Sequence, residues 1–231
     1  MKPIVLVVML AMAGTAWGQA VPAAKVTEPS RLVVEAGIGG ESGLGYKLPF
    51  IKFGGGVEIP LGQRFEAQAF AHYSPTAKEG QAWSRTLQVR GTGIVWVTPN
   101  LGATGTLERS WLWSETYSKA AWYPQVGVVW RGTWLDTNLR VYGRYTLPTG
   151  GYDAKLGIEA PQLQGPGIRA EAEMLSWLRI YTELDVFHGL RQGNPVCDGT
   201  LGDGSQVGIA SCGRSGYWTG RTVTGVQFIF R

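Results

Sequence analysis

Short segments in which apolar and charged side chains alternate dominate the sequence and limit what the chain can fold into. Residues 167–175 place Ile168, Ala170 and Ala172 on one side, with arginine and glutamate at the positions between them. Successive side chains of a β-strand point to opposite faces. Each segment of this kind therefore predicts a strand with one apolar and one charged face, and the chain as a whole predicts an all-β fold.

The connections between these segments alternate in length. We predict ten strands, near residues 31–40, 48–59, 63–74, 83–97, 101–113, 121–131, 136–147, 167–175, 178–189 and 217–230. Short connections at 60–62, 99–100, 132–135 and 176–177 alternate with longer ones at 41–47, 75–82, 114–120, 148–166 and 190–216. Membrane barrels have short periplasmic turns and long outer loops. The alternation predicts an antiparallel up-and-down transmembrane β-barrel, with eight or twelve strands as the alternatives.

The charged faces carry arginine and glutamate in similar number and few lysines. The fixed fork of a guanidinium group suits several carboxylate contacts in a confined space, and buried charges must be paired. We therefore predict that a charge network fills the lumen, with these members: Glu35, Lys52, Glu58, Arg64, Glu66, Arg90, Glu108, Arg140, Arg144, Arg169, Glu171, Glu173, Arg179, Glu183 and Asp185. A soluble secreted β-barrel that acts as a binding module is the alternative fold, but its polar faces would be richer in lysine, serine and threonine.

The apolar faces are nearly free of charge, with Arg109 as the exception near the outer end of its strand. A charge on the lipid face costs roughly 2–4 kcal/mol at the bilayer midplane. Aromatic residues gather at the strand ends. One group lies toward the long loops (Tyr73, Trp83, Trp111, Trp113, Trp122, Tyr145, Trp218) and another toward the short turns (Phe65, Trp96, Trp130, Trp134, Trp177, Phe230). Two such groups predict the aromatic girdles of the two membrane interfaces.

The first eighteen residues have the pattern of a secretory signal peptide. Lys2 is followed by the apolar run 4–13 and by Ala16-Trp17-Gly18, a small-x-small cleavage pattern. The apolar run is shorter than the ~20 residues that a membrane-spanning helix needs. We expect Sec-type export with cleavage near Gly18/Gln19, a flexible periplasmic leader at 19–30, and an outer-membrane barrel at 31–231.

The final segment reads as a strand that is hydrophobic to its end. Gly225-x-x-Phe228-x-Phe230 resembles the C-terminal signature by which bacterial outer-membrane barrels are recognised for assembly, although Arg231 follows the last aromatic here. The resemblance implies the barrel-assembly machinery as a partner. We expect this strand to close the barrel against 31–40, with Phe228 and Phe230 toward lipid and Gln227 inward.

As a whole, the chain resembles small outer-membrane barrels of the opacity, OmpA-barrel or OmpW-like kind. The resemblance implies outer-membrane lipid and lipopolysaccharide as partners. An excess of lysine and arginine of only +4 gives no reason to expect nucleic-acid binding. A barrel of this size leaves little room beyond its own side chains. We therefore expect a non-enzymatic barrel without a cofactor, used for surface contact or adhesion or for narrow passage of small solutes.

Two further features bear on chemistry. Cys197 and Cys212 lie in the longest connection, and export favours a disulfide between them. A metal site there is not expected, because no histidine or third cysteine lies nearby. His72 and Ser74 share one strand face and could serve a lipid A-modifying hydrolase, which is the enzymatic alternative. His72 is expected to face the lumen, however, and His188 the membrane rim.

Overall fold

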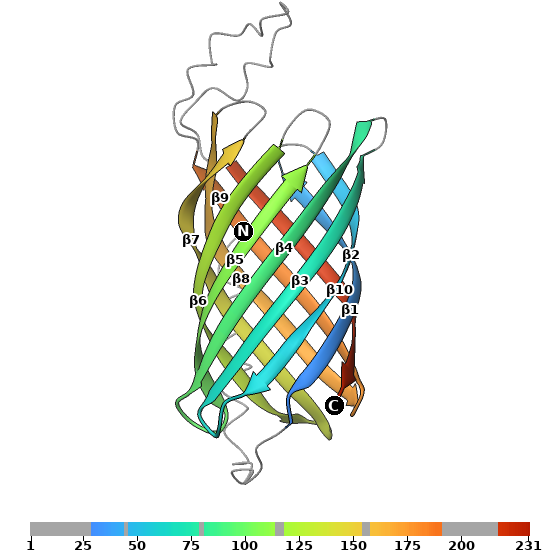
Figure 1. The fold of residues 1–231 in the computed structure, drawn as a ribbon, viewed down its shortest axis with the longest axis vertical. Helices are drawn as coiled ribbons and strands as arrows, with labels where there is room; N and C mark the ends of the chain where they lie inside the picture. Colours follow the sequence, from blue (N-terminus) through green and yellow to red (C-terminus); the bar gives the residue numbers. More distant parts are fainter. Residues whose placement is uncertain (1–28, 44–45, 79–80, 114–117, 154–157, 191–216) are drawn as a thin grey trace, which may run out of the picture.

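The chain forms a closed antiparallel barrel of ten strands, each hydrogen-bonded to its sequence neighbours (Figure 1). The computed structural model describes residues 29–43, 46–78, 81–113, 118–153, 158–190 and 217–231. The strands are β1 (Arg31–Gly43), β2 (Tyr46–Pro60), β3 (Phe65–Lys78), β4 (Gln81–Trp96), β5 (Leu101–Trp113), β6 (Ser118–Trp134), β7 (Thr137–Asp153), β8 (Ile158–Leu175), β9 (Leu178–Leu190) and β10 (Tyr217–Phe230). The prediction of ten strands in up-and-down order is confirmed.

The barrel closes where β10 pairs with β1. The register runs from Leu32 opposite Phe230 to Gly43 opposite Thr219, with Glu35 opposite Gln227. Figure 1 places the C-terminus at the end of the barrel that carries the short turns. The predicted closure against 31–40 is confirmed, and no strand edge is left unpaired along this part of the described chain.

The exterior of the barrel is apolar and its interior is polar. On β1, Ile38 on the outer face is 70% exposed, whereas Val33 and Glu35 on the inner face are fully buried. Large apolar side chains are also exposed on the other strands, whereas many of the buried side chains are charged. A soluble barrel has the opposite arrangement, so this exterior is that of a barrel that spans a membrane. No helix of the described residues is long and apolar enough to cross a membrane.

The strands extend further than predicted at the end with the long connections. Much of the predicted loops 41–47, 75–82, 114–120 and 148–166 is strand, so their predicted extents are wrong. Backbone pairing between neighbouring strands continues past the glycines and prolines there, with register shifts between Thr146 and Gly151. Ladder hydrogen bonds have overridden the turn preference of these residues, and bulges accommodate the misfit.

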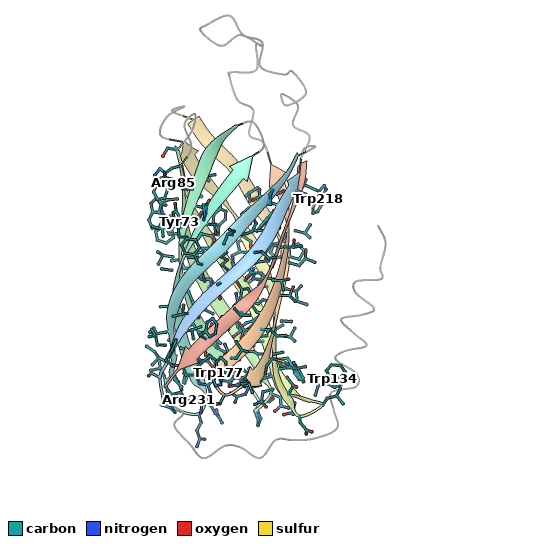
Figure 2. All side chains as sticks on the ribbon, turned by 90° about the vertical axis from the view of Figure 1, so that its right-hand side faces the viewer. Tyr73, Arg85, Trp134, Trp177, Trp218 and Arg231 are labelled. Carbon is teal, nitrogen blue, oxygen red and sulfur yellow. The ribbon has the colours of Figure 1, made fainter. Side chains whose placement is uncertain are left out.

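The described aromatic side chains form the two predicted bands, with one correction; the side chain of Trp83 lies outside the described part of the structure. Figure 2 shows Tyr73 and Trp218 at the end with the long connections, and Trp134 and Trp177 at the short-turn end. Trp96 was predicted in the lower band but lies inside the lumen, 5% exposed, in a cluster with Ile94 and other apolar side chains. Trp96 is two residues from the inward-facing Ile94 on β4, so both side chains point into the lumen.

Three predictions lie outside the described residues. They are the signal peptide 1–18 with its cleavage near Gly18/Gln19, the leader up to residue 28, and the disulfide between Cys197 and Cys212.

Candidate functional site

Glu35 lies at the centre of a charge network in the half of the lumen nearer to the short turns. Its carboxylate is fully buried. One oxygen lies 3.0 Å from Lys52 Nζ and 3.0 Å from His72 Nε2. The other accepts hydrogen bonds from Arg169 at 3.0 Å and from Gln227 at 2.8 Å. These four side chains come from β2, β3, β8 and β10, so a single carboxylate of β1 contacts four other strands of the wall.

Two arginines extend the network from Glu35. The Arg169 guanidinium also donates to Glu171 at 2.8 Å and to Glu183 at 3.0 Å. Arg179 donates to Glu58 at 2.9 Å, to Glu171 at 3.2 Å and to Gln227 at 3.0 Å. Each guanidinium thus serves three acceptors, which uses the planar fork of arginine in a way that lysine cannot match.

Further contacts cross the lumen from β7. Arg140 donates to Glu66 of β3 at 2.8 Å, and Gln68 donates to the Tyr142 hydroxyl at 3.1 Å. Arg144 pairs with Asp185 at 2.7 Å and with Glu183. Apolar side chains fill the space beside these pairs, and Trp96, Val129 and Tyr142 are among them. Polar contacts and apolar packing together close this half of the barrel.

Glycines in β2 make room for the neighbouring ring of His72. A Cβ at Gly54 would meet the backbone of Ala71 and the His72 ring, and a Cβ at Gly56 would meet the Phe70 ring. The rings of Phe70 and His72 stack with their centres 5.7 Å apart. Glycine allows the two rings to lie over β2, and this sets His72 Nε2 against Glu35.

Beyond the network, toward the long connections, the lumen contains a cavity of about 180 Å³. Lys52, His72, Arg144, Glu183 and Asp185 form its border with the network, and the remaining lining includes Glu41, Phe50, Ser74, Thr86, Gln88, Arg90, Glu108, Ser110, Tyr123, Gln125, Thr219 and Arg221. A smaller cavity of about 30 Å³ lies beside Gln68, Tyr142 and Arg169. The half of the lumen near the short turns (the closed half) is therefore more fully packed than the half toward the long connections (the hollow half).

Most of the charged residues predicted for the lumen do line it, but not all join the network. Arg64 is exposed in the turn before β3, because the strand begins one residue later. Glu173 is half-buried at the short-turn end, where it lies 3.9 Å from Arg231. Arg90 and Glu108 line the cavity, and no ion pair joins Arg90 to a carboxylate of the described chain.

The network has uncharged members, and the cavity has two charged residues, that the charge pattern did not single out. Tyr142 and Gln68 link β7 to β3, and Glu41 of β1 and Arg221 of β10 line the cavity. Arg221 has the parity of the inward-facing Gln227, so extending the alternation through the last strand would have found it.

His72 and Ser74 both face the lumen, 3% and 4% exposed. No hydrogen bond joins the two side chains in the described structure, and His72 is instead held by Glu35. His188 faces outward against Trp218, with 4.8 Å between the ring centres.

Comparisons with known proteins show the fold and nothing finer. No family model and no curated protein matches the chain. The outer membrane protease OmpT from Escherichia coli is similar in structure, with a TM-score of 0.53 and 10% identity over 92% of this chain and 99% of that one. The translocator domain of the autotransporter NalP from Neisseria meningitidis has a TM-score of 0.45 and 13% identity, covering 97% and 96% of the two chains. The first of these likenesses supports a barrel of the outer-membrane kind, and at such low identity activity does not transfer.

Proposed function

We propose that the chain is a non-enzymatic outer-membrane barrel with a plugged lumen, which acts at the cell surface through contact or adhesion. The observation that carries this proposal is the set of ion pairs from one wall to another. Arg169 binds Glu35, Arg179 binds Glu58 and Arg140 binds Glu66, each across the lumen. Ion pairs that cross the lumen support a plug, because their side chains occupy the space that a wide diffusion pore would need.

The location and partners belong to the same proposal. An apolar exterior with aromatic bands supports an outer-membrane position, and the fold likeness agrees with it. On the outer face near the long connections, Arg109 lies over the rings of Trp111 and Trp122, 5.5 and 5.0 Å from their centres. A cation at that interface suits the phosphates of lipopolysaccharide. We keep the opacity, OmpA-barrel or OmpW-like class as the nearest functional comparison, and the barrel-assembly machinery as the partner of the segment 225–230.

Conductance across a planar lipid bilayer tests the plug. We expect no steady current from the folded wild-type protein in 1 M KCl. The quadruple variant Glu35→Ala, Glu58→Ala, Arg169→Ala, Arg179→Ala removes two cross-lumen pairs together and should open a measurable channel. Arg85→Gln, on the exposed outer side of β4, is the control and should stay closed. A steady current through the wild-type protein would contradict the plug and favour narrow passage of small solutes.

The enzymatic alternatives have separate tests. Mass spectrometry of lipid A from cells that express the wild type or His72→Ala should give identical spectra, since His72 and Ser74 are buried in the lumen, away from a lipid substrate. Incubation of the folded barrel with a fluorogenic peptide library should release no signal. A lipid A change that depends on His72, or specific peptide cleavage, would contradict the non-enzymatic proposal.

A further inference from the structure

The cavity in the lumen is lined by two arginines that form no ion pair within the part of the chain that the structure describes. Arg90 is 9% exposed, and its guanidinium lies 5.8 Å from the centre of the Phe70 ring. Arg221 lies 5.0 Å from the centre of the Phe50 ring and donates one hydrogen bond, at 3.3 Å, to Gln88 Oε1. Within the residues that the structure describes, no carboxylate forms an ion pair with either guanidinium. A buried charge without a partner is costly. A bound anion would give these two guanidinium groups the counter-ion that carboxylates give to the other lumen arginines.

Both arginines have acidic neighbours in register, but none of them forms an ion pair with the arginine in the described structure. Glu41 lies opposite Arg221 across the β1–β10 pair and also lines the cavity. Glu108 is opposite Arg90 across the β4–β5 pair, yet its carboxylate accepts a hydrogen bond from Gln88 at 2.9 Å. Asp185 is opposite Arg221 across the β10–β9 pair, yet it binds Arg144. The two guanidiniums therefore keep donors available toward the cavity.

Gln88 places the two arginines at one site. It lies two residues from Arg90 on the same face of β4, a separation of about 7 Å along the strand, and it also holds Arg221 from β10. Beside it, the Ser74 hydroxyl is buried and has no hydrogen-bond partner among the described residues. Ser74 is opposite Thr86, so it is the diagonal neighbour of Gln88.

We propose that this cavity binds a small oxyanion, a carboxylate or a phosphate, between Arg90 and Arg221, with the Ser74 hydroxyl as a further donor. Guanidinium groups bind such anions with two parallel hydrogen bonds. The volume of about 180 Å³ is below the roughly 300–1,000 Å³ of pockets for drug-sized ligands. The ligand is therefore of the size of inorganic phosphate or a short dicarboxylate. Glu41 and Glu108 also line the cavity, and their negative charges oppose the anion and limit its affinity.

Calorimetric titration of the folded barrel in a non-ionic detergent tests this site, with succinate and inorganic phosphate as probes and neutral succinamide as the blank. The wild type should bind at least one of the two anions saturably, with one site per chain. Arg90→Gln and Arg221→Gln should each weaken binding by about tenfold or more, because each removes a charged hydrogen-bond donor. Glu108→Gln should tighten it. Arg85→Gln makes the same charge change on the outer side of β4 and should leave the affinity unaltered.

The heat-modified gel shift of each variant confirms folding before titration. Arg221 is less buried than Arg90, so its variant provides the test even if Arg90→Gln does not fold. Absence of saturable binding to both anions in the wild type overturns the proposal. So does equal weakening by Arg85→Gln, or unchanged affinity in the folded cavity variants. None of these results depends on whether the barrel conducts.

Discussion

The two halves of the lumen are built from the same ten strands but use their charges differently. In the half near the short turns, Arg169 and Arg179 each donate to three acceptors. Four polar side chains lie within 3.0 Å of the Glu35 carboxylate, and two of them donate hydrogen bonds to it. In the half near the long connections, Arg90 and Arg221 have no ion pair among the described residues, and the Ser74 hydroxyl has no partner there. The first arrangement holds the wall together, whereas the second leaves groups available to a ligand.

The difference follows from what lies between the charged side chains. The closed half contains large inward-facing apolar residues such as Trp96 and Tyr142, which leave the arginines and carboxylates in direct contact. The hollow half includes short polar side chains such as Ser74, Thr86 and Ser110 among its longer ones, and a cavity of about 180 Å³ remains between them. We therefore expect removal of a charge from the closed half to cost more stability than removal of a charge from the hollow half.

The same substitution in each half tests this comparison most strongly. Glu35→Gln leaves the buried Lys52 and Arg169 without the negative charge that they share, and should lower the free energy of unfolding by about 3–5 kcal/mol. Glu108→Gln retains an acceptor for Gln88 and should cost less than about 1 kcal/mol. Urea unfolding in detergent micelles, followed by tryptophan fluorescence, measures both. Equal losses in the two variants would show that the halves do not differ in this respect.

The closed half is also packed tightly at the backbone, where the barrel seam passes through it. A Cβ at Gly225 would meet Ala36 and Gly37 of β1 and the Tyr181 ring. Gly225→Ala should therefore destabilise the barrel by about 1–3 kcal/mol through overpacking.

Gly91 of β4 is the matched control for that change. Nothing in the described structure lies within 4 Å of a Cβ built there. Gly91→Ala should be neutral or stabilise by about 0.5–1 kcal/mol, as expected when alanine replaces glycine inside a strand. Urea unfolding measures the free energy of unfolding of both variants. An unchanged value for Gly225→Ala would show that the backbone at the seam can shift to make room for the added methyl group.

The alternation of the sequence was sufficient to predict which face each strand turns inward. The odd or even position of each residue along its strand assigned Glu35, Arg169 and Arg179 to the lumen. The alternation of short and long connections predicted that β10 closes the barrel against β1. Trp96 was placed in an aromatic band because it lies near a strand end, and this prediction was wrong. The alternation of faces along β4 puts it inside the lumen. The same rule places Arg221 at the cavity.

The partners inside the lumen could not be predicted in the same way. Arg169 and Glu35 are 134 residues apart in the chain and meet only because β8 and β1 lie across a closed barrel. Their contact depends on strand tilt and stagger, which no local pattern encodes. The upper ends of β7 and β8 were missed for a related reason, since their pairing depends on a neighbouring strand and not on their own glycines and prolines.

The smallest expected effect concerns single hydroxyl groups in the hollow half. Ser74→Ala removes an oxygen that has no hydrogen-bond partner among the described residues, and should change the free energy of unfolding by less than about 0.5 kcal/mol. Thr219→Val removes a donor that binds the Ser42 carbonyl at 3.0 Å, and should cost about 1 kcal/mol. Urea unfolding should resolve the pair when both variants are measured together. A loss in Ser74→Ala as large as that in Thr219→Val would mean that Ser74 is engaged within the protein itself, and it would then contribute nothing further to an anion in the cavity.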